Sequence, residues 1–221
     1  MRASRVLLAA FALATAVDLG SLLAGADTGH TVAKPLLMPL LAGYAGLRGA
    51  PRLLVAALLF GWGGDTLLLS DADPAFLAGM ASFAAGHVCY LALFHRTGTA
   101  RARAALLLPG YAVALLTTVA LLWPDLPADL RLPVAVYSTL LTAMAYAAAT
   151  RLGLVAGLGG ALFMVSDTLI ATGVADWPQL PRPDFWIMLT YAAAQFLLVR
   201  GTLDERRVPT AAYGEVRSTT P

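Results

Sequence analysis

Two aspartates in matching apolar contexts are the residues of this sequence best suited to do chemistry. Asp65 lies in segment 61–69, Gly-Trp-Gly-Gly-Asp-Thr-Leu-Leu-Leu, and Asp167 lies in segment 163–171, where Asp-Thr-Leu recurs. An ionisable residue within hydrocarbon costs roughly 2.5 to 3.5 kcal/mol on insertion scales, so such residues usually face a bundle interior and serve a function. One carboxylate could be a helix-end residue near the lipid headgroups. Two in the same local context indicate a site.

The chemistry open to two such carboxylates is acid and base catalysis. If Asp65 and Asp167 approach each other, like-charge repulsion in a low dielectric would favour one shared proton, which gives an acid and a base from identical residues. Such a pair can hydrolyse an acid-labile bond without a metal. The sequence has no zinc spacing, phosphate loop, Gly-x-Ser-x-Gly elbow or second cysteine beside Cys89, so we expect neither a metal nor a cofactor.

The composition is typical of an integral membrane protein. Apolar residues make up 59% of the 221 residues and charged residues 13%, about half the charged fraction of a soluble domain. Each helical span takes about 20 residues. We therefore predict an all-α polytopic protein with eight transmembrane helices within residues 1–200, and a disordered cytoplasmic tail over 201–221. A net charge of +2 is too small to indicate nucleic-acid binding.

Hydrophobic runs and helix-breaking residues divide the chain into eight predicted helices. Their ranges are 4–25, 34–48, 52–69, 74–95, 104–123, 132–150, 152–172 and 184–200. Pro35 is expected in the first turn of the second helix, where its missing N–H is harmless. Asp73 is expected to cap the fourth helix. The sixth and seventh helices are so close in sequence that we predict a tight hairpin between them.

The positive residues predict how the chain is oriented in the membrane. With eight spans both termini share a side, which carries twelve arginines, whereas the opposite side has only Lys34, Arg131 and Arg182. The positive-inside rule then makes both termini cytoplasmic. The preference for arginine over lysine and the abundance of alanine favour a GC-rich bacterial genome, so we expect the bacterial inner membrane.

This topology brings the two aspartates to a common depth. Asp65 lies 13 residues beyond Arg52, and Asp167 lies 15 beyond Leu152, so both are about 20 Å from the cytoplasmic end at 1.5 Å per residue. Asp18, late in the first helix, is near the same level. The third and seventh helices run the same way, and a 4+4 internal repeat would explain their matching segments.

Other polar residues are expected near this level. Lys34 would begin the second helix from the outer side, and Ser166 directly precedes the second aspartate. Tyr191 and Gln195 share one face of the eighth helix at i, i+4 spacing. A mid-span histidine needs a polar partner, so the stripe that contains it on the fourth helix is expected to face a cavity. This stripe consists of Phe76, Gly79, Phe83, His87 and Tyr90. The glycines at 61–64 would permit close helix contact.

Together these segments resemble the successive signatures of the lysoplasmalogenase (YhhN-like) family. The matching segments are Lys34-Pro35-Leu36-Leu37, Gly64-Asp65-Thr66-Leu67-Leu68, Phe76-x-x-Gly79 with Phe83, His87-x-x-Tyr90, Gly160-Ala161-Leu162-Phe163-x-x-Ser166-Asp167 and Tyr191-x-x-x-Gln195. They follow one another in order over residues 34–195. The family often has a second tyrosine after the one that matches Tyr191, and Ala192 stands there instead.

The resemblance implies a membrane hydrolase that cleaves the vinyl-ether bond of alkenyl lysophospholipids. The products would be a fatty aldehyde and glycerophosphoethanolamine or glycerophosphocholine, and the catalytic residues Asp65 and Asp167. One aspartic acid would protonate the alkene, while the other carboxylate stabilises the oxocarbenium ion and activates water. Lys34 would hold the lipid phosphate. The full set of expected substrate-binding residues is Lys34, His87, Tyr191, Gln195 and Ser166. For Lys34, His87 and Tyr191, a structural hydrogen-bonding role is an equal alternative.

Three other readings of buried carboxylates are open. An intramembrane aspartyl protease would need glycine where Trp62 stands, and peptide cleavage would identify it. A proton-coupled carrier also uses buried Asp, His and Lys, and liposome flux without hydrolysis would identify it. A purely structural membrane protein would leave the paired aspartates unexplained. The oligomeric state is not encoded in any of these patterns.

Overall fold

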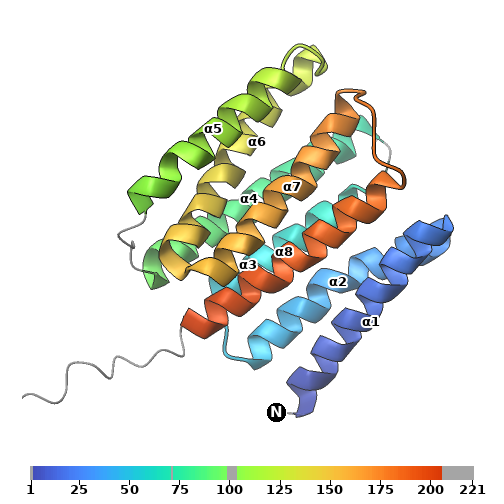
Figure 1. Cartoon of the computed structure of the whole chain (residues 1–221). Coiled ribbons are helices and arrows are strands. Elements are labelled where there is room, and N and C mark those ends of the chain that lie inside the picture. Colours follow the sequence, from blue (N-terminus) through green and yellow to red (C-terminus); the bar gives the residue numbers. More distant parts are fainter. Residues whose placement is uncertain (1, 71, 99–103, 206–221) are drawn as a thin grey trace, which may run out of the picture.

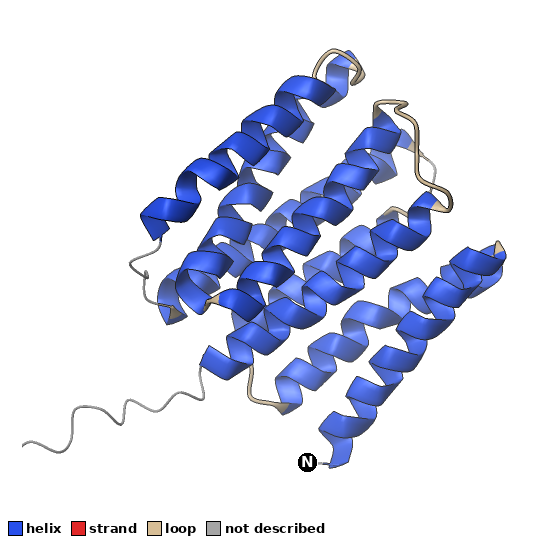
Figure 2. Cartoon of the chain, viewed as in Figure 1, coloured by secondary structure: helices blue, strands red, loops and turns tan. Residues whose placement is uncertain are grey.

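The computed structural model describes residues 2–70, 72–98 and 104–205, and every element in this part of the chain is helical (Figure 1, Figure 2). The helices are α1 (Arg2–Ala24), α2 (Asp27–Leu47), α3 (Arg52–Leu67), α4 (Asp73–Thr97), α5 (Ala104–Leu122), α6 (Ala128–Ala147), α7 (Leu154–Val174) and α8 (Pro183–Glu205). A π-helical turn, η1 (Ala148–Leu152), follows α6. The predicted all-α fold is confirmed.

Consecutive helices run in opposite directions, so the start of α1 and the end of α8 lie at the same end of the bundle (Figure 1). Helices α1 and α5 lie at opposite edges. The predicted hairpin between the sixth and seventh helices is confirmed, because only η1 and Gly153 separate α6 from α7. Gly153 has a φ of 90°, a left-handed conformation that glycine adopts without a steric cost.

The core of the bundle is centred on α8, while α5 lies at its edge. In their most apolar stretches, 56% of α8 is buried but only 6% of α5. The largest fully buried side chains include Tyr44, Tyr90, Phe94 and Phe163. Since apolar surface left outside the core is compatible with lipid, this distribution suits a protein in a membrane.

Six of the described helices are long and apolar enough to cross a membrane, namely α1, α4, α5, α6 with η1, α7 and α8. Helix α3 has 16 residues, fewer than the ~20 that a span usually needs. Helix α2 is long enough but carries Asp27, His30 and Lys34. The protein is therefore an integral membrane protein with at least six candidate spans.

Two expectations for helix starts are wrong. Helix α2 begins at Asp27 and not at Lys34, so Pro35 lies inside the helix and not in its first turn. A proline inside a membrane helix is tolerated because neighbouring groups satisfy the freed backbone carbonyl, which makes proline an unreliable start signal here. Asp73 is the first residue of α4 and does not cap it, since Ala72 occupies the capping position without a side-chain hydrogen bond.

The end of α8 also differs from the prediction. The helix continues five residues past Arg200 to Glu205, and Gly201, Thr202 and Leu203 are buried. These residues pack into the bundle, which explains why the helix does not stop at the change to polar composition. Residues 206–221 of the predicted tail lie outside the described residues.

Candidate active site

Asp65 on α3 is held by a chain of hydrogen bonds that crosses to α8 and α4. Its Oδ2 accepts a 2.8 Å hydrogen bond from the Tyr191 hydroxyl. That hydroxyl accepts a 3.4 Å hydrogen bond from Gln195 Nε2, and Gln195 Oε1 accepts one of 2.6 Å from the Tyr90 hydroxyl. The expected pairing of Tyr191 and Gln195 is thus part of a longer chain that fixes Asp65.

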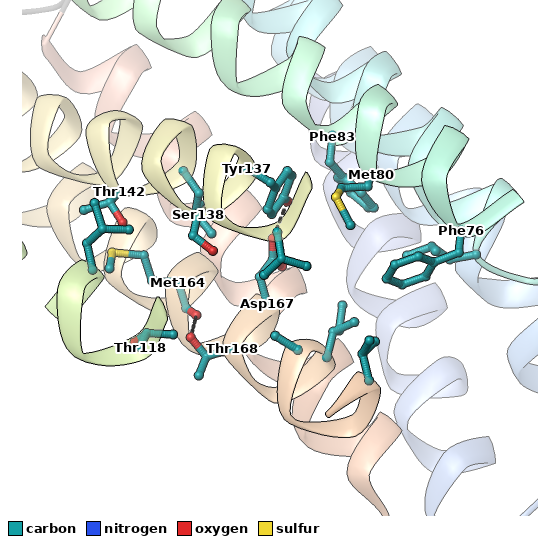
Figure 3. Close-up of a pocket in the computed structure, with 17 residues that line it drawn as sticks. Phe76, Met80, Phe83, Thr118, Tyr137, Ser138, Thr142, Met164, Asp167 and Thr168 are labelled. Carbon is teal, nitrogen blue, oxygen red and sulfur yellow. Dashed lines mark hydrogen bonds between the residues drawn. The ribbon is translucent and has the colours of Figure 1, made fainter. Parts of the chain in front are cut away.

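Asp167 on α7 is held by a second chain that also ends on α4. The Tyr137 hydroxyl, from α6, donates a short hydrogen bond to Asp167 Oδ2 (Figure 3), and His87 Nε2 lies 3.1 Å from the Tyr137 oxygen. Because the one hydroxyl proton of Tyr137 goes to Asp167, His87 Nε2 must be the donor to the tyrosine oxygen. His87 Nδ1 is buried without a hydrogen-bond partner, which suits a neutral imidazole.

Aromatic rings fill the space between the two chains. Phe163 packs edge-on against Tyr191 and His87, with centroid distances of 5.4 Å and 4.8 Å. Phe83 packs edge-on against Tyr191 at 5.9 Å. Asp65 and Asp167 are close enough to interact electrostatically. Phe163 therefore packs against one member of each hydrogen-bond chain, which brings the two chains side by side.

Glycines of α3 make this approach of helices possible. A Cβ atom at Gly64 would lie 2.4 Å from the Phe83 ring, and one at Gly61 would lie 3.0 Å from the Tyr191 hydroxyl. The first distance is shorter than real Cβ contacts, and the second is tighter than most of them. The prediction that the 61–64 glycines serve close helix contact is confirmed.

An apolar pocket opens beside Asp167. Its wall includes side chains of α4, α5, α6 and α7 and Leu68, which directly follows α3, and Figure 3 shows Asp167 and Tyr137 facing Phe76, Met80 and Phe83. The predicted α4 stripe is divided, since Phe76 and Phe83 line the pocket while His87 and Tyr90 are buried behind it, each 1% exposed. The pocket wall does not include Asp65, which is 2% exposed. Only one of the two aspartates therefore faces the pocket directly.

Two residues expected at the site do not line the pocket. Ser166 donates a 3.1 Å hydrogen bond to the Ile187 carbonyl, so it fastens α7 to α8 and does not line the pocket. Lys34 lies seven residues into α2, about 10 Å along the helix. It interacts electrostatically with Asp65 and does not line the pocket either. Its expected position at the start of a helix is therefore wrong.

Two other groups were not expected from the sequence. Tyr137 lies 15 residues before Leu152, and Asp167 lies 15 residues after it, so the hairpin brings them to the same level. A buried tyrosine hydroxyl usually has a hydrogen-bond partner. Together with the equal spacing from Leu152, this could have identified Tyr137 as the partner of Asp167. The other is the pair formed by Asp18 Oδ1 and His30 Nδ1, 2.8 Å apart.

The described part of the chain has no group of three His, Cys, Asp or Glu side chains that could hold a metal ion. The site thus consists of two tyrosine-bound carboxyl groups, a neutral histidine and an apolar pocket. Such groups can supply and remove a proton in a poorly hydrated place.

Comparison with known proteins relates this chain to a family. The sequence profile of the YhhN family matches residues 29–202. The chain is 36% identical over 159 residues to the human protein named lysoplasmalogenase TMEM86B, an alignment that covers 70% of this chain and 65% of that protein. It is 34% identical over 171 residues to the lysoplasmalogenase of Mycobacterium tuberculosis, covering 72% and 63%. The chain thus spans slightly less than two thirds of these relatives. No solved structure matches it.

Proposed function

Since the chain belongs to the YhhN family, we propose that it hydrolyses the vinyl-ether bond of alkenyl lysophospholipids within the membrane. The products would be a fatty aldehyde and a glycerophosphodiester such as glycerophosphoethanolamine or glycerophosphocholine. The names of the related proteins support the substrate class. The observation that carries the chemistry is Asp167, a carboxyl group on the wall of an apolar pocket that is held by Tyr137, which in turn is bonded to His87.

In this proposal Asp167 is the general acid. It protonates the alkene carbon farther from the ether oxygen, which leaves an oxocarbenium ion and a carboxylate. The same carboxylate then takes a proton from the water that adds to the cation, as the acid residue of retaining glycosidases does in its second step. The hemiacetal then collapses. Its C–O bond to glycerol breaks, the hydroxyl oxygen becomes the aldehyde oxygen, and the hydroxyl proton passes to the departing glycerol oxygen. One water is consumed, and Asp167 ends the cycle protonated.

Asp65 has an electrostatic role in the same proposal. It is buried behind the pocket wall and interacts with Lys34 and Asp167. In the proposal Asp65 is a carboxylate, and its fixed negative charge near the pocket stabilises the oxocarbenium ion as it forms. Tyr191 and Gln195 hold Asp65 in place through their hydrogen bonds.

We also propose that all eight helices cross the membrane, with both termini in the cytoplasm of a bacterium. Helices α2 and α3 are antiparallel to their neighbours and contribute buried residues to the core, so their polar groups need not face lipid. The twelve arginines on one side support the orientation. The 4+4 repeat, which would relate α3 to α7, stays a prediction.

The test of function is mass spectrometry of the purified protein after incubation with alkenyl, alkyl and acyl lysophospholipids of one headgroup. We expect a fatty aldehyde from the alkenyl lipid only, because a saturated ether and an ester cannot form the oxocarbenium ion by alkene protonation. The control is the Asp167→Asn variant, purified and assayed in parallel. Fatty acid release from the acyl lipid with no aldehyde from the alkenyl lipid would contradict the proposal.

A further inference from the structure

An apolar groove continues from the Asp167 pocket along the space between α5 and α7. Three residues line both the pocket and the neighbouring hollow, namely Thr118, Met164 and Thr168. Tyr111 and Ala161 are in turn shared by that hollow and a third one. The hollows therefore join into one α5–α7 groove, which starts at Asp167 and ends at Ala104 and Leu154.

Small side chains keep this groove open. Gly110 and Ala114 line it from α5, and Ala161 and Gly157 line it from α7. A Cβ atom at Gly110 would have no atom within 4 Å, and Leu122 is the only buried residue of α5. Apolar walls without contacting atoms lose dispersion energy, so a hydrocarbon chain that fills the groove would be stabilised there.

The length of the groove fits a single lipid chain. On α7, 14 residues separate Leu154 from Thr168, and on α5, 14 separate Ala104 from Thr118. At 1.5 Å per residue both walls are about 21 Å long. The hydrocarbon of one leaflet is about 15 Å deep, half of the ~30 Å core. The groove can therefore hold one lipid chain along its length.

We propose that the α5–α7 groove binds the alkenyl chain of the substrate, with the vinyl-ether carbons at Asp167 and the methyl end towards Leu154. This inference rests on the proposed function, since it assigns the position of the same substrate. With the alkenyl chain in this position, the lipid headgroup would lie at the opposite mouth of the pocket, near Phe76, where α4 begins. In this proposal the groove takes one chain, and a phospholipid with two chains would leave its second chain outside.

The groove predicts that a bulky residue acts as a stop whose position sets the longest accepted chain. Ala114 lies four residues and Gly110 eight residues from Thr118, about 6 and 12 Å along α5. The longest chain that Ala114→Leu accepts should therefore be shorter than the longest chain that Gly110→Leu accepts. We expect kcat/KM to fall about tenfold for every two methylene groups that no longer enter the groove, so the loss should be smallest for the shortest chains.

The matched control is Gly20→Leu on α1, where a new Cβ would also meet no atom within 4 Å. This variant should keep the chain-length profile of the unmodified protein. If Ala114→Leu and Gly110→Leu show that same profile while the unmodified protein releases aldehyde, the groove is not the chain site and the proposed function stands.

A binding experiment tests the groove without turnover. The probe is an uncleavable alkyl-ether lysophospholipid with a photoreactive diazirine at the end of its chain. We expect its label on peptides of α5 and α7 that contain Leu107 or Leu154, both of which line the far end of the groove, and reduced label there in Gly110→Leu. Label on α1 and α2, or equal labelling by a two-chain phospholipid probe, would overturn the inference whether or not the protein is a hydrolase.

Discussion

Asp65 and Asp167 occupy corresponding segments of α3 and α7 but differ in their surroundings. Each accepts a hydrogen bond from a tyrosine of a neighbouring helix, Tyr191 for Asp65 and Tyr137 for Asp167. Asp65 is buried and interacts with Lys34, whereas Asp167 lines the apolar pocket. The same residue type in similar local sequence thus has unequal access to a ligand.

The difference arises from the helices that surround each aspartate, because the two local sequences are similar. The side of the bundle formed by α1 and α2 supplies charged neighbours to Asp65, among them Asp18 and Lys34. The side formed by α4 and α6 supplies a neutral hydrogen-bond chain and an opening to Asp167. We infer a proton donor at Asp167 and a fixed charge at Asp65.

The largest effect is expected for Asp167→Asn. An amide of the same shape cannot donate the proton to the alkene, so kcat should fall at least about 10³-fold, within the range of general acid catalysis. Aldehyde release by the purified variant measures this, and thermal unfolding in detergent checks that the fold is retained. Turnover within tenfold of the unmodified protein would remove Asp167 from the chemistry.

A smaller loss is expected for Asp65→Asn, because this residue acts through its charge and does not transfer the proton. We expect kcat to fall about 10²-fold, as for the loss of one preorganised electrostatic group, with KM nearly unchanged. Steady-state assays of both aspartate variants on one substrate give the comparison. If Asp65→Asn is the more damaging of the two, the assignment of roles is reversed.

Substitutions of the two tyrosines test whether the two hydrogen-bond chains contribute unequally to kcat. Tyr137→Phe leaves the Asp167 carboxyl group without its donor, and the loss of a hydrogen bond to a charged group costs about 1.5 to 3 kcal/mol. We expect kcat to fall about 30-fold. Tyr191→Phe is the matched variant on the Asp65 side, and its kcat should fall less. Equal losses would show that the two carboxyl groups depend equally on their tyrosines.

Lys34→Gln separates two roles for the lysine. Its interaction with Asp65 predicts that kcat falls about fivefold, which corresponds to about 1 kcal/mol in the barrier, while KM is unchanged. The sequence predicted phosphate binding, for which KM would rise and kcat would not. Measuring KM and kcat for substrates with different headgroups distinguishes the electrostatic role from phosphate binding. A rise in KM alone would support the phosphate binding expected from the sequence.

The smallest effect is expected for Ser166→Ala. The hydroxyl bonds the Ile187 carbonyl on α8 and does not line the pocket, so kcat should change less than about threefold while unfolding becomes easier by about 1 kcal/mol. A thermal melt together with the aldehyde assay measures both. A large loss of activity in a stable variant would support the substrate-binding role that the sequence predicted for Ser166.

Much of the fold could be predicted because hydrophobic runs of membrane length are visible in sequence. The hairpin before Leu154 and the close contacts of the 61–64 glycines followed from short connections and small residues, and both are confirmed. The start of α2 was missed because Pro35 resembles a helix start, although it lies inside the helix.

The sequence by itself determined that the protein is all-helical and that it lies in a membrane, because helix formation and hydrophobicity are local properties. The common depth of Asp65 and Asp167 stays a prediction. Only the tertiary structure decided which of them faces the pocket and which residues bind them. Tyr137 and Tyr191 reach their partners across 30 and 126 residues of sequence. Contacts between helices depend on how side chains pack in three dimensions, and no local pattern records that.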